Sequence, residues 1–243
     1  MKRVIVMGAS SGIGREVCLM MLERGWQVGI AARRKDMLDE IRQAYPDQVK
    51  TRLIDVTTED APALLAELIK ELGGVDVYLH ASGFGKQNYN LDTDIERHTV
   101  AVNCDGFAAL IGSVFHYMNA NDGGHIVSVS SIAGTKGLGI APSYSATKAF
   151  QSTYIQALEQ LSNMRGSKVR FTDIRPGFVD TPFLADAGRF PMMMDVCKVA
   201  KDIMDAIDNQ SHVKVIDWRY RILVFFWRLI PNSVWRNLKV KGR

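Results

Sequence analysis

Short apolar runs rich in β-branched residues alternate along the chain with longer stretches in which apolar residues recur every three or four positions. The short runs predict strands at Arg3–Met7, Gln27–Ala32, Thr51–Asp55, Val75–Ala81, His125–Ser130, Val169–Arg175 and Val213–Ile216. The longer stretches predict helices at Glu16–Arg24, Met37–Tyr45, Pro62–Leu72, Asp94–Met118, Ser143–Asn163 and Asp195–Asn209. Such alternation, with early strands that are almost wholly apolar, is typical of a parallel sheet covered on both faces. We therefore predict an α/β fold: a Rossmann-like, doubly wound parallel sheet of about seven strands, in a single domain.

Composition agrees with a globular chain and sets the last residues apart from the rest. Of the 243 residues, 47% are hydrophobic and 23% are charged, which excludes a disordered, collagen-like or disulfide-stapled chain. The net charge is +4, but residues 214–243 hold eight basic residues and one acidic residue, so the preceding part is slightly acidic. We divide the chain into a Rossmann-type domain at 1–217 and a basic, aromatic, amphipathic tail at 218–243.

The cysteines and the apolar runs bear on where the protein resides. Cys18, Cys104 and Cys197 form neither a CxxC pair nor a metal-ligand pattern, so we expect reduced thiols, no metal site and a cytoplasmic location. The apolar run Val4–Met7 is too short for a signal peptide, and Ile222–Trp227 is far short of the roughly 20 residues that a spanning helix needs. We expect no membrane-spanning helix.

A glycine-rich loop follows the first predicted strand and reads Gly8-Ala9-Ser10-Ser11-Gly12-Ile13-Gly14. Glycines allow a tight turn and let backbone N–H groups approach a pyrophosphate, which the positive end of the next helix also attracts. The spacing favours dinucleotide binding, although a tight strand–helix connection without a ligand would look the same. The loop is similar to the cofactor loop of the short-chain dehydrogenase/reductase family. That resemblance assigns cofactor contacts to Gly8, Ser10, Ser11, Gly12, Ile13 and Gly14.

The end of the second predicted strand bears on the choice of cofactor. In this fold an acidic residue there binds the ribose hydroxyls of NAD, whereas an arginine accommodates the 2′-phosphate of NADP. Ala32 stands at the acidic position and Arg33 follows it, which favours NADP(H) and leaves NAD(H) as the alternative. A solvated basic pair, Arg33-Arg34, without a ligand is the other interpretation.

Two further segments resemble family motifs that border the cofactor. Asp55-Val56 resembles the pair that contacts adenine, although a helix-capping turn would explain Asp55 equally well. Gly83 matches the last position of the family's Asn-Asn-Ala-Gly motif, which reads His80-Ala81-Ser82-Gly83 here. We interpret His80 as a hydrogen-bonded structural residue without a catalytic role.

Tyr144 and Lys148 form a YxxxK motif on a predicted helix, so their side chains lie on one face. A phenol with a pKa near 10 is mostly protonated at neutral pH, and a nearby ammonium lowers that pKa. Such a tyrosine can give a proton to a carbonyl oxygen or take one from an alcohol. An amphipathic helix with a solvent-reaching lysine would carry the same motif without chemistry.

Other residues extend the resemblance over roughly residues 3–216. Ser131, thirteen residues before Tyr144, resembles the catalytic serine, with Ser130 as the neighbouring alternative. Asn103 resembles the asparagine that holds a water in a proton relay to the lysine. The segment Pro176-Gly177-Phe178-Val179-Asp180-Thr181 resembles the PGxVxT motif at the nicotinamide. The resemblance thus assigns catalytic roles to Asn103, Ser131, Tyr144 and Lys148, and cofactor contacts to Asn103, Tyr144, Lys148, Pro176, Gly177, Val179 and Thr181.

The resemblance implies an NAD(P)(H)-dependent oxidoreductase that interconverts a carbonyl and a secondary alcohol, with its sites in 1–217. A dinucleotide-binding sensor or scaffold that has lost its chemistry is the alternative. A sugar-nucleotide epimerase would need a larger substrate domain than the chain supplies. The family commonly pairs through the helices that carry Asn103 and Tyr144, which implies a homodimer or homotetramer.

The sequence leaves alternatives open for the substrate class and for the role of the tail. Residues 183–194, which resemble the family's substrate lid, hold two phenylalanines, Leu184 and three methionines, and Gly188 and Pro191 break a long helix there. They suit a lipophilic small molecule, or a loop that packs on the core. In the tail, aromatic residues alternate with basic ones, as in an interfacial membrane anchor. Packing over the substrate cleft or at a subunit contact is the alternative, and no motif favours nucleic acid.

Overall fold

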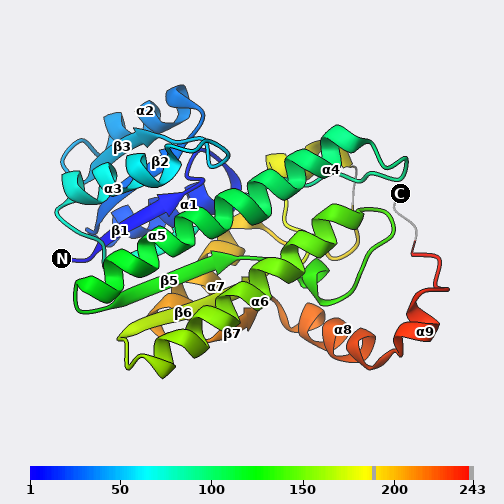
Figure 1. Cartoon of the computed structure of the whole chain (residues 1–243). Helices are drawn as coiled ribbons and strands as arrows, with labels where there is room; N and C mark the ends of the chain where they lie inside the picture. Colours follow the sequence, from blue (N-terminus) through cyan, green and yellow to red (C-terminus); the bar gives the residue numbers. More distant parts are fainter. Residues whose placement is uncertain (188–189, 241–243) are drawn as a thin grey trace.

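The computed structural model describes residues 1–187 and 190–240 and contains a parallel sheet (Figure 1). Its strands are β1 (Arg3–Met7), β2 (Gln27–Ala32), β3 (Val49–Leu53), β4 (Val77–His80), β5 (Gly124–Val129), β6 (Val169–Arg175) and β7 (Val213–Val215). The order is β3-β2-β1-β4-β5-β6-β7. The predicted α/β, Rossmann-like fold class is therefore confirmed, and the chain order reverses between β1 and β4.

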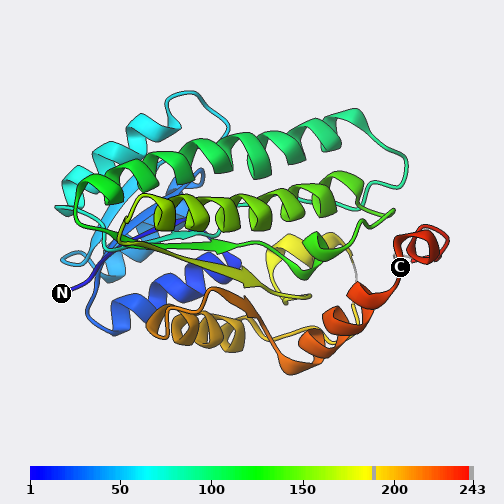
Figure 2. The same cartoon turned by 60° about the horizontal axis from the view of Figure 1, so that its bottom comes forward.

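Helices cover both faces of the sheet because alternate residues of each strand point to opposite sides. Val4 and Val6 of β1 belong to one hydrophobic cluster, and Ile5 and Met7 belong to the other. The first cluster packs under α1 (Gly12–Glu23), α2 (Lys35–Ala44) and α7 (Val196–Asp208), and the second under α3 (Ala61–Leu72), α5 (Phe107–Ala120) and α6 (Pro142–Met164). Figure 2 shows the layers edge-on, with α5 and α6 in green above the sheet and α1 and α7 in blue and orange below it.

The helix expected at Asp94–Met118 is interrupted in its regular winding. It runs as α4 (Thr93–Val100), a π-helical segment η1 (Ala101–Gly106) and then α5. A Cβ at Gly106 would lie 2.1 Å from the Val56 carbonyl oxygen, so the wide π turn packs directly on the backbone that follows β3. π-helical turns are common at functional sites, and this one contains Asn103.

The strand expected at Thr51–Asp55 is β3 at Val49–Leu53, because its ladder with β2 ends at Leu53. Asp55 therefore lies in the following loop and not in the strand. The shift places Asp55 at the carboxyl edge of the sheet, beside the loops that follow β1 and β2.

One helix, from Thr93 to Ala120, is long and apolar enough to cross a membrane by length and composition alone. We expected no such helix from the longest apolar run. In the fold its apolar side chains, including Phe107, Leu110 and Val114, are buried in the second cluster. It is a core helix that covers one face of the sheet.

The tail forms α8 (Trp218–Leu229) and the short α9 (Asn232–Trp235), which run along the edge of the fold beyond β7 (Figure 1). Tyr220 and Val224 of α8 are buried and belong to the first cluster. The inner face of α8 is thus continuous with the core of residues 1–217.

Candidate functional site

The loops that follow the strands meet at the carboxyl edge of the sheet, where ligands bind in this architecture. Gly8, which follows β1, has a φ of +94°, and a Cβ there would lie 2.7 Å from the Ser82 nitrogen in the loop after β4. A Cβ at Gly14 would lie 2.3 Å from the Gly8 carbonyl oxygen. Close backbone packing therefore requires both glycines. Beside them α1 begins at Gly12 and leaves its first N–H groups free for an anion, while Ile13 packs on the core.

Arg34, and not the expected Arg33, contacts this glycine loop. Its Nη2 donates to Ser10 Oγ at 2.9 Å and to Ser11 Oγ at 2.6 Å. The Arg33 side chain is 61% exposed and lies 3.9 Å from the Asp55 carboxylate. A guanidinium beside two hydroxyls suits a phosphate, so Arg34 is a candidate binding residue that sequence reasoning missed. Both arginines follow the strand, and sequence spacing does not say which one turns toward the loop.

Asp55, Val56 and Gly83 occupy the same edge with different contacts. Thr57 donates to Asp55 Oδ1 from its backbone nitrogen at 3.0 Å and from its hydroxyl at 2.8 Å. These bonds close a local turn in the loop, and because α3 begins at Ala61 with Asp60 at its N-cap, the turn does not cap that helix. The adenine contact of Asp55 stays a prediction. Val56 is buried beside it. Gly83 faces the polar interior, since a Cβ there would lie 3.5 Å from Lys148 Nζ.

Tyr144 and Ser131 come together from two elements that follow one another in the chain. Tyr144 lies in the first turn of α6, and Ser131 caps η2 (Ile132–Thr135), the 3-10 helix after β5. The Ser131 hydroxyl is near enough to the Tyr144 phenol to lower its pKa, and Ser131 Oγ itself donates to the Pro176 carbonyl oxygen at 3.5 Å. The neighbouring Ser130 hydroxyl instead donates to the Asp173 carboxylate and, at 3.2 Å, to a β6 carbonyl oxygen. The structure thus brings Ser131 to the tyrosine and ties Ser130 into the core.

Lys148 lies one turn further along α6 and is only 4% exposed. Its Nζ donates to the Val129 carbonyl oxygen at 3.0 Å and to Gln151 Oε1 at 2.9 Å, and it lies 5.8 Å from the centroid of the Tyr144 ring. Burial lowers the pKa of Lys148 to about 8, against the opposing charge of Asp173. The lysine is therefore mostly charged at neutral pH and loses its charge just above it.

The pKa of Tyr144 shifts in the direction opposite to the one expected from the YxxxK motif. Burial raises this pKa, and the nearby Ser131 hydroxyl lowers it only in part. A phenolate that is removed from water loses the hydration that stabilises its charge. One hydroxyl, and an ammonium 5.8 Å from the ring centroid, stabilise that charge less than water does. Tyr144 therefore rests as a neutral phenol, which is the form that gives a proton.

Asn103, in η1, uses its whole side-chain amide within the protein. Its Oδ1 accepts from the Phe84 N–H at 2.9 Å, and its Nδ2 donates to the Phe84 carbonyl oxygen at 2.7 Å and to Thr147 Oγ1 at 3.0 Å. These bonds hold the loop after β4 against α6. The Asn103 side chain therefore positions the walls of the site, while its backbone carbonyl faces another partner.

That partner is Gln151, which connects Asn103 with Lys148. Its Nε2 donates to the Asn103 carbonyl oxygen at 3.0 Å, and its Oε1 accepts from Lys148 Nζ at 2.9 Å. Gln151 is buried, so a protein amide connects the Asn103 backbone with the Lys148 ammonium. The water relay that the resemblance implies stays a prediction. Sequence reasoning missed Gln151. The signal was its place three residues after Lys148, on the same helix face.

The segment after β6 lies between the glycine loop and η2. The Pro176 carbonyl oxygen accepts from the Ile132 N–H at 3.1 Å, which joins the segment to the serine loop. A Cβ at Gly12 would lie 3.3 Å from the Thr181 side chain, and Val179 is buried between them and the core. The expected contacts of the Pro-Gly segment are therefore brought to the same edge as the glycine loop.

Tyr220 of the tail contacts both the Pro-Gly segment and the turn around Met192. Its Oη accepts from the Phe178 N–H at 3.2 Å and donates to the Met192 carbonyl oxygen at 3.1 Å. A Cβ at Gly177 would lie 2.3 Å from the Tyr220 ring. Two residues of the predicted lid were expected to break a long helix. Gly188 lies outside the described residues. The Pro191 carbonyl oxygen lies 3.3 Å from Tyr220 Oη, which holds the turn there.

His80 ends β4 inside the core. Its Nδ1 lies within hydrogen-bond distance, 3.0 Å, of Tyr78 Oη, and its ring packs edge-on against Phe107. Burial, with the charge of Lys148, lowers the pKa of His80 to about 3. It is a neutral, hydrogen-bonded core residue, as we interpreted it from the sequence.

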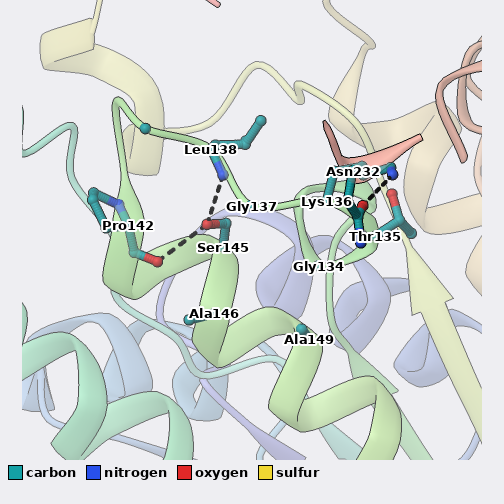
Figure 3. Close-up of a pocket in the computed structure, with 11 residues that line it drawn as sticks. Gly134, Thr135, Lys136, Gly137, Leu138, Pro142, Ser145, Ala146, Ala149 and Asn232 are labelled. Atoms are coloured by element: carbon teal, nitrogen blue, oxygen red, sulfur yellow. Dashed lines mark hydrogen bonds between the residues drawn. The ribbon is translucent and has the colours of Figure 1, made fainter. Parts of the chain in front are cut away.

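A cavity of about 570 Å³ lies beside the start of α6 (Figure 3). The loop Gly134–Gly139, the start of α6 and Asn232 of α9 line it, and Ser145 Oγ bonds the loop at Leu138 N, 3.0 Å away. Lys136 Nζ bonds Asn232 Oδ1 at 2.9 Å across its edge. Ser131, Tyr144 and Lys148 do not line it. Within residues 1–187 and 190–240, no group of three or more His, Cys, Asp or Glu residues could hold a metal ion.

Bacterial proteins are similar to this chain over nearly its full length. An uncharacterized oxidoreductase of Myxococcus xanthus (strain DK1622) is 37% identical over 241 residues, which cover 96% of this chain and 94% of the relative. An uncharacterized oxidoreductase of Staphylococcus saprophyticus is 30% identical over 222 residues, which cover 88% of this chain and 94% of the relative.

Solved structures share the fold at low sequence identity. The structure described as ElxO with NADP bound has a TM-score of 0.80 at 22% identity, over 91% of this chain and 99% of its own. A 3-ketoacyl-(acyl-carrier-protein) reductase from Brucella melitensis, complexed with NADH, has a TM-score of 0.78 at 20% identity, over 89% and 96%. The family described as short chain dehydrogenase matches residues 2–190, from the first strand to the segment after β6. With this match and the relatives above, the chain belongs to the short-chain dehydrogenase family.

Proposed function

We propose that this protein is an NADP(H)-dependent oxidoreductase that interconverts a carbonyl and a secondary alcohol, with Tyr144 as general acid/base. One observation carries the proposal: a neutral Tyr144 phenol lies beside the Ser131 hydroxyl and has the Lys148 ammonium buried near its ring. A proton donor, a second hydroxyl and a fixed cation are what an oxygen needs when charge develops on it. Membership of an oxidoreductase family agrees with this chemistry.

A nicotinamide dinucleotide fits the residues at the carboxyl edge. Gly8 and Gly14 form a cradle that a Cβ would fill, and the free N–H groups of α1 suit a pyrophosphate. Arg34 with Ser10 and Ser11 suits a further phosphate, and this supports a preference for NADP(H). NAD(H) is the alternative cofactor. One structure of this fold is described with NADP bound and another as complexed with NADH, which supports a nicotinamide dinucleotide as the cofactor.

Each catalytic side chain has a distinct task in the proposed reaction. The bound dinucleotide supplies or takes up a hydride. Tyr144 gives its proton to the substrate oxygen during reduction and takes it back during oxidation. Ser131 donates a hydrogen bond to the same oxygen, and Lys148 stabilises the phenolate that Tyr144 becomes. Val129 and Gln151 hold the Lys148 ammonium in place.

The neighbourhood of Tyr144 supports a lipophilic small molecule as substrate. The Phe183 ring lies 5.9 Å from the Tyr144 ring, centroid to centroid, and Phe183 is 46% exposed. Phe178 stacks on Phe190 at 4.2 Å in the same segment. Aromatic walls beside the proton donor favour an apolar group next to the reacting carbonyl.

The test compares wild type with Tyr144→Phe for NADPH oxidation against ketones, quinones and lipid-like carbonyls. The variant should bind NADPH with nearly unchanged affinity, measured by fluorescence, and lose turnover by about 10³-fold or more. Unchanged turnover would refute the role of Tyr144. Absence of turnover by the wild type across the panel, with NADPH bound, would favour the sensor or scaffold alternative.

The remaining parts of the proposal concern assembly and location. We propose a homodimer or homotetramer that forms through the helices carrying Asn103 and Tyr144, where Phe150 of α6 is partly exposed and stacks on Tyr154. Light scattering of wild type and Phe150→Ser would test that contact. Three free cysteines agree with a cytoplasmic location.

A further inference from the structure

Helix α8 has two faces of opposite character. Tyr220 and Val224 are buried, whereas Trp218, Ile222, Phe225 and Leu229 point away from the fold and are 49–65% exposed. These four residues follow one another at intervals of four, three and four positions, so they form a single stripe along the outer face. We name Trp218, Ile222, Phe225 and Leu229 the outer stripe. Figure 1 shows α8 at the lower edge of the molecule, outside the layers that flank the sheet.

Basic residues border the outer stripe. Arg221 and Arg228 lie on one side of it and are exposed, and Arg236 and Lys239 follow in the chain. The nearest acid in the sequence is Asp217, whose carboxylate is bonded by Arg219 at 2.9 Å. No acidic residue follows Asp217 in the sequence. The surface therefore combines exposed aromatic side chains with positive charges that no acid of the tail neutralises.

The inner face of α8 holds the stripe outward. Trp227 Nε1 donates to Thr135 Oγ1 at 2.8 Å, Trp235 Nε1 donates to the Gly137 carbonyl oxygen at 2.7 Å, and Lys136 Nζ donates to the Ile230 carbonyl oxygen at 2.9 Å. Together with the bonds of Tyr220, these contacts fix α8 and α9 on the loops beside α6. Turning the outer stripe inward would break them.

We propose that the outer stripe and its arginines dock the protein on a membrane surface that contains anionic lipids. Aromatic and aliphatic side chains enter the headgroup boundary, and the arginines meet anionic headgroups. A second copy fits less well, because a symmetric contact through α8 would bring the basic side chains of two copies together, and α8 supplies no acid to pair with them. A helix of 12 residues is also only about 18 Å long, and its outer face is small beside the roughly 800 Å² per partner of a stable interface.

Docking in this orientation would leave the loops around Thr135 and Met192 one helix diameter, roughly 10 Å, from the lipid surface, because they contact the inner face of α8. A lipophilic substrate could then reach the site from the membrane. The docking itself does not depend on the proposed reductase activity, because it is measured as binding.

The experiment uses the full chain and vesicles of phosphatidylcholine, with and without 30% phosphatidylserine as the probe lipid (on the order of physiological anionic content). Co-sedimentation should show binding to the anionic vesicles that weakens as salt rises. The pair Arg221→Gln and Arg228→Gln should weaken binding by about 30-fold, which corresponds to about fivefold per arginine. Ile222→Ser with Phe225→Ser should weaken it by at least about 10-fold.

Met164→Ser is the matched control, since Met164 is 77% exposed at the far end of α6, and it should bind vesicles like the wild type. Absence of vesicle binding by the wild type, or equal binding by all variants, would overturn the proposal. A dimer that both pairs of substitutions abolish, without vesicle binding, would instead assign the stripe to a second copy. Circular dichroism verifies the fold, and the arginine pair tests the surface even if the apolar pair is destabilised.

Discussion

Helix α6, which carries Tyr144 and Lys148, and the tail helix α8 depart from the usual burial pattern in opposite ways. Along α6, polar side chains are buried, among them Ser143, Ser145, Thr147, Lys148 and Gln151. Along α8, large apolar side chains are exposed. In α6 the buried groups are hydrogen-bonded, which offsets the cost of removing them from water. The apolar side chains of the outer stripe have no comparable partner within the described residues. The buried polar groups of α6 find their partners within the protein. The exposed apolar side chains of α8 instead fit a partner outside it.

The largest expected effect comes from breaking the buried cation of α6. Lys148→Met should lower turnover by about 10³-fold, because the phenolate loses its stabilising charge. It should also remove a pH dependence of stability. Between pH 8 and about 10 the unfolded lysine still binds a proton and the folded one does not, so the free energy of unfolding of the wild type should rise with pH, at most by about 1.4 kcal/mol per pH unit.

Urea denaturation of both proteins without cofactor, from pH 7 to 9.5, measures this difference. The difference in unfolding free energy should shift in favour of the wild type as pH rises. Parallel pH profiles would contradict the burial of a charged Lys148.

The next effect concerns the amide that holds the lysine. Gln151→Leu removes an acceptor of Lys148 and the donor to the Asn103 carbonyl oxygen, so turnover should fall by about 10-fold or more. Loss of a bond to the charged form should also lower the pKa of Lys148, whereas the carboxylate of Gln151→Glu should raise it. The alkaline limb of the kcat profile should therefore move down in pH for the first variant and up for the second. Identical limbs in all three proteins would reduce Gln151 to a packing role.

A smaller effect separates the two arginines at the cofactor edge. Arg34→Ala should raise KM for NADPH by about 10-fold with little change for NADH, because its guanidinium is held beside Ser10 and Ser11. Arg33→Ala is the matched control, and it should change KM for NADPH less, since Arg33 is turned toward Asp55. Steady-state kinetics with both cofactors decide it, and the reverse ranking would restore Arg33 to the role expected from the sequence.

The smallest effects compare the two faces of α8. Tyr220→Phe removes the hydroxyl that bonds Phe178 and Met192 and should cost about 1–2 kcal/mol of unfolding free energy. Phe225→Ser, on the outer stripe, should stay within about 0.5 kcal/mol. Urea denaturation of the two variants measures both. A larger loss for Phe225→Ser would mean that the outer face contributes to folding.

Much of the fold and part of the candidate site could be predicted because they depend on local patterns. The alternation of apolar periods predicts the sheet and its helices, and the spacing of thirteen residues distinguishes Ser131 from Ser130. The shift of β3 away from Asp55 was not predicted, because strand ends depend on the ladder with β2 and not on β propensity alone.

Other features depend on tertiary contacts that no sequence period contains. Arg33 and Arg34 are adjacent, and their sequence positions do not determine which side chain contacts the glycine loop. The raised pKa of Tyr144 follows from burial, which opposes the effect of Lys148. The YxxxK motif does not show how deeply the phenol is buried. The inner face of α8 depends on Tyr220, which meets a glycine 43 positions earlier in the chain.

The contact between Gly177 and Tyr220 limits how these two positions can change in evolution. Because a Cβ at Gly177 would enter the Tyr220 ring, any larger residue at 177 requires a smaller one at 220. A tail inherited from another relative by recombination would therefore succeed only where it brings a residue that tolerates this glycine. The C-terminal helix and the Pro-Gly segment form one heritable unit, although they lie in different parts of the sequence.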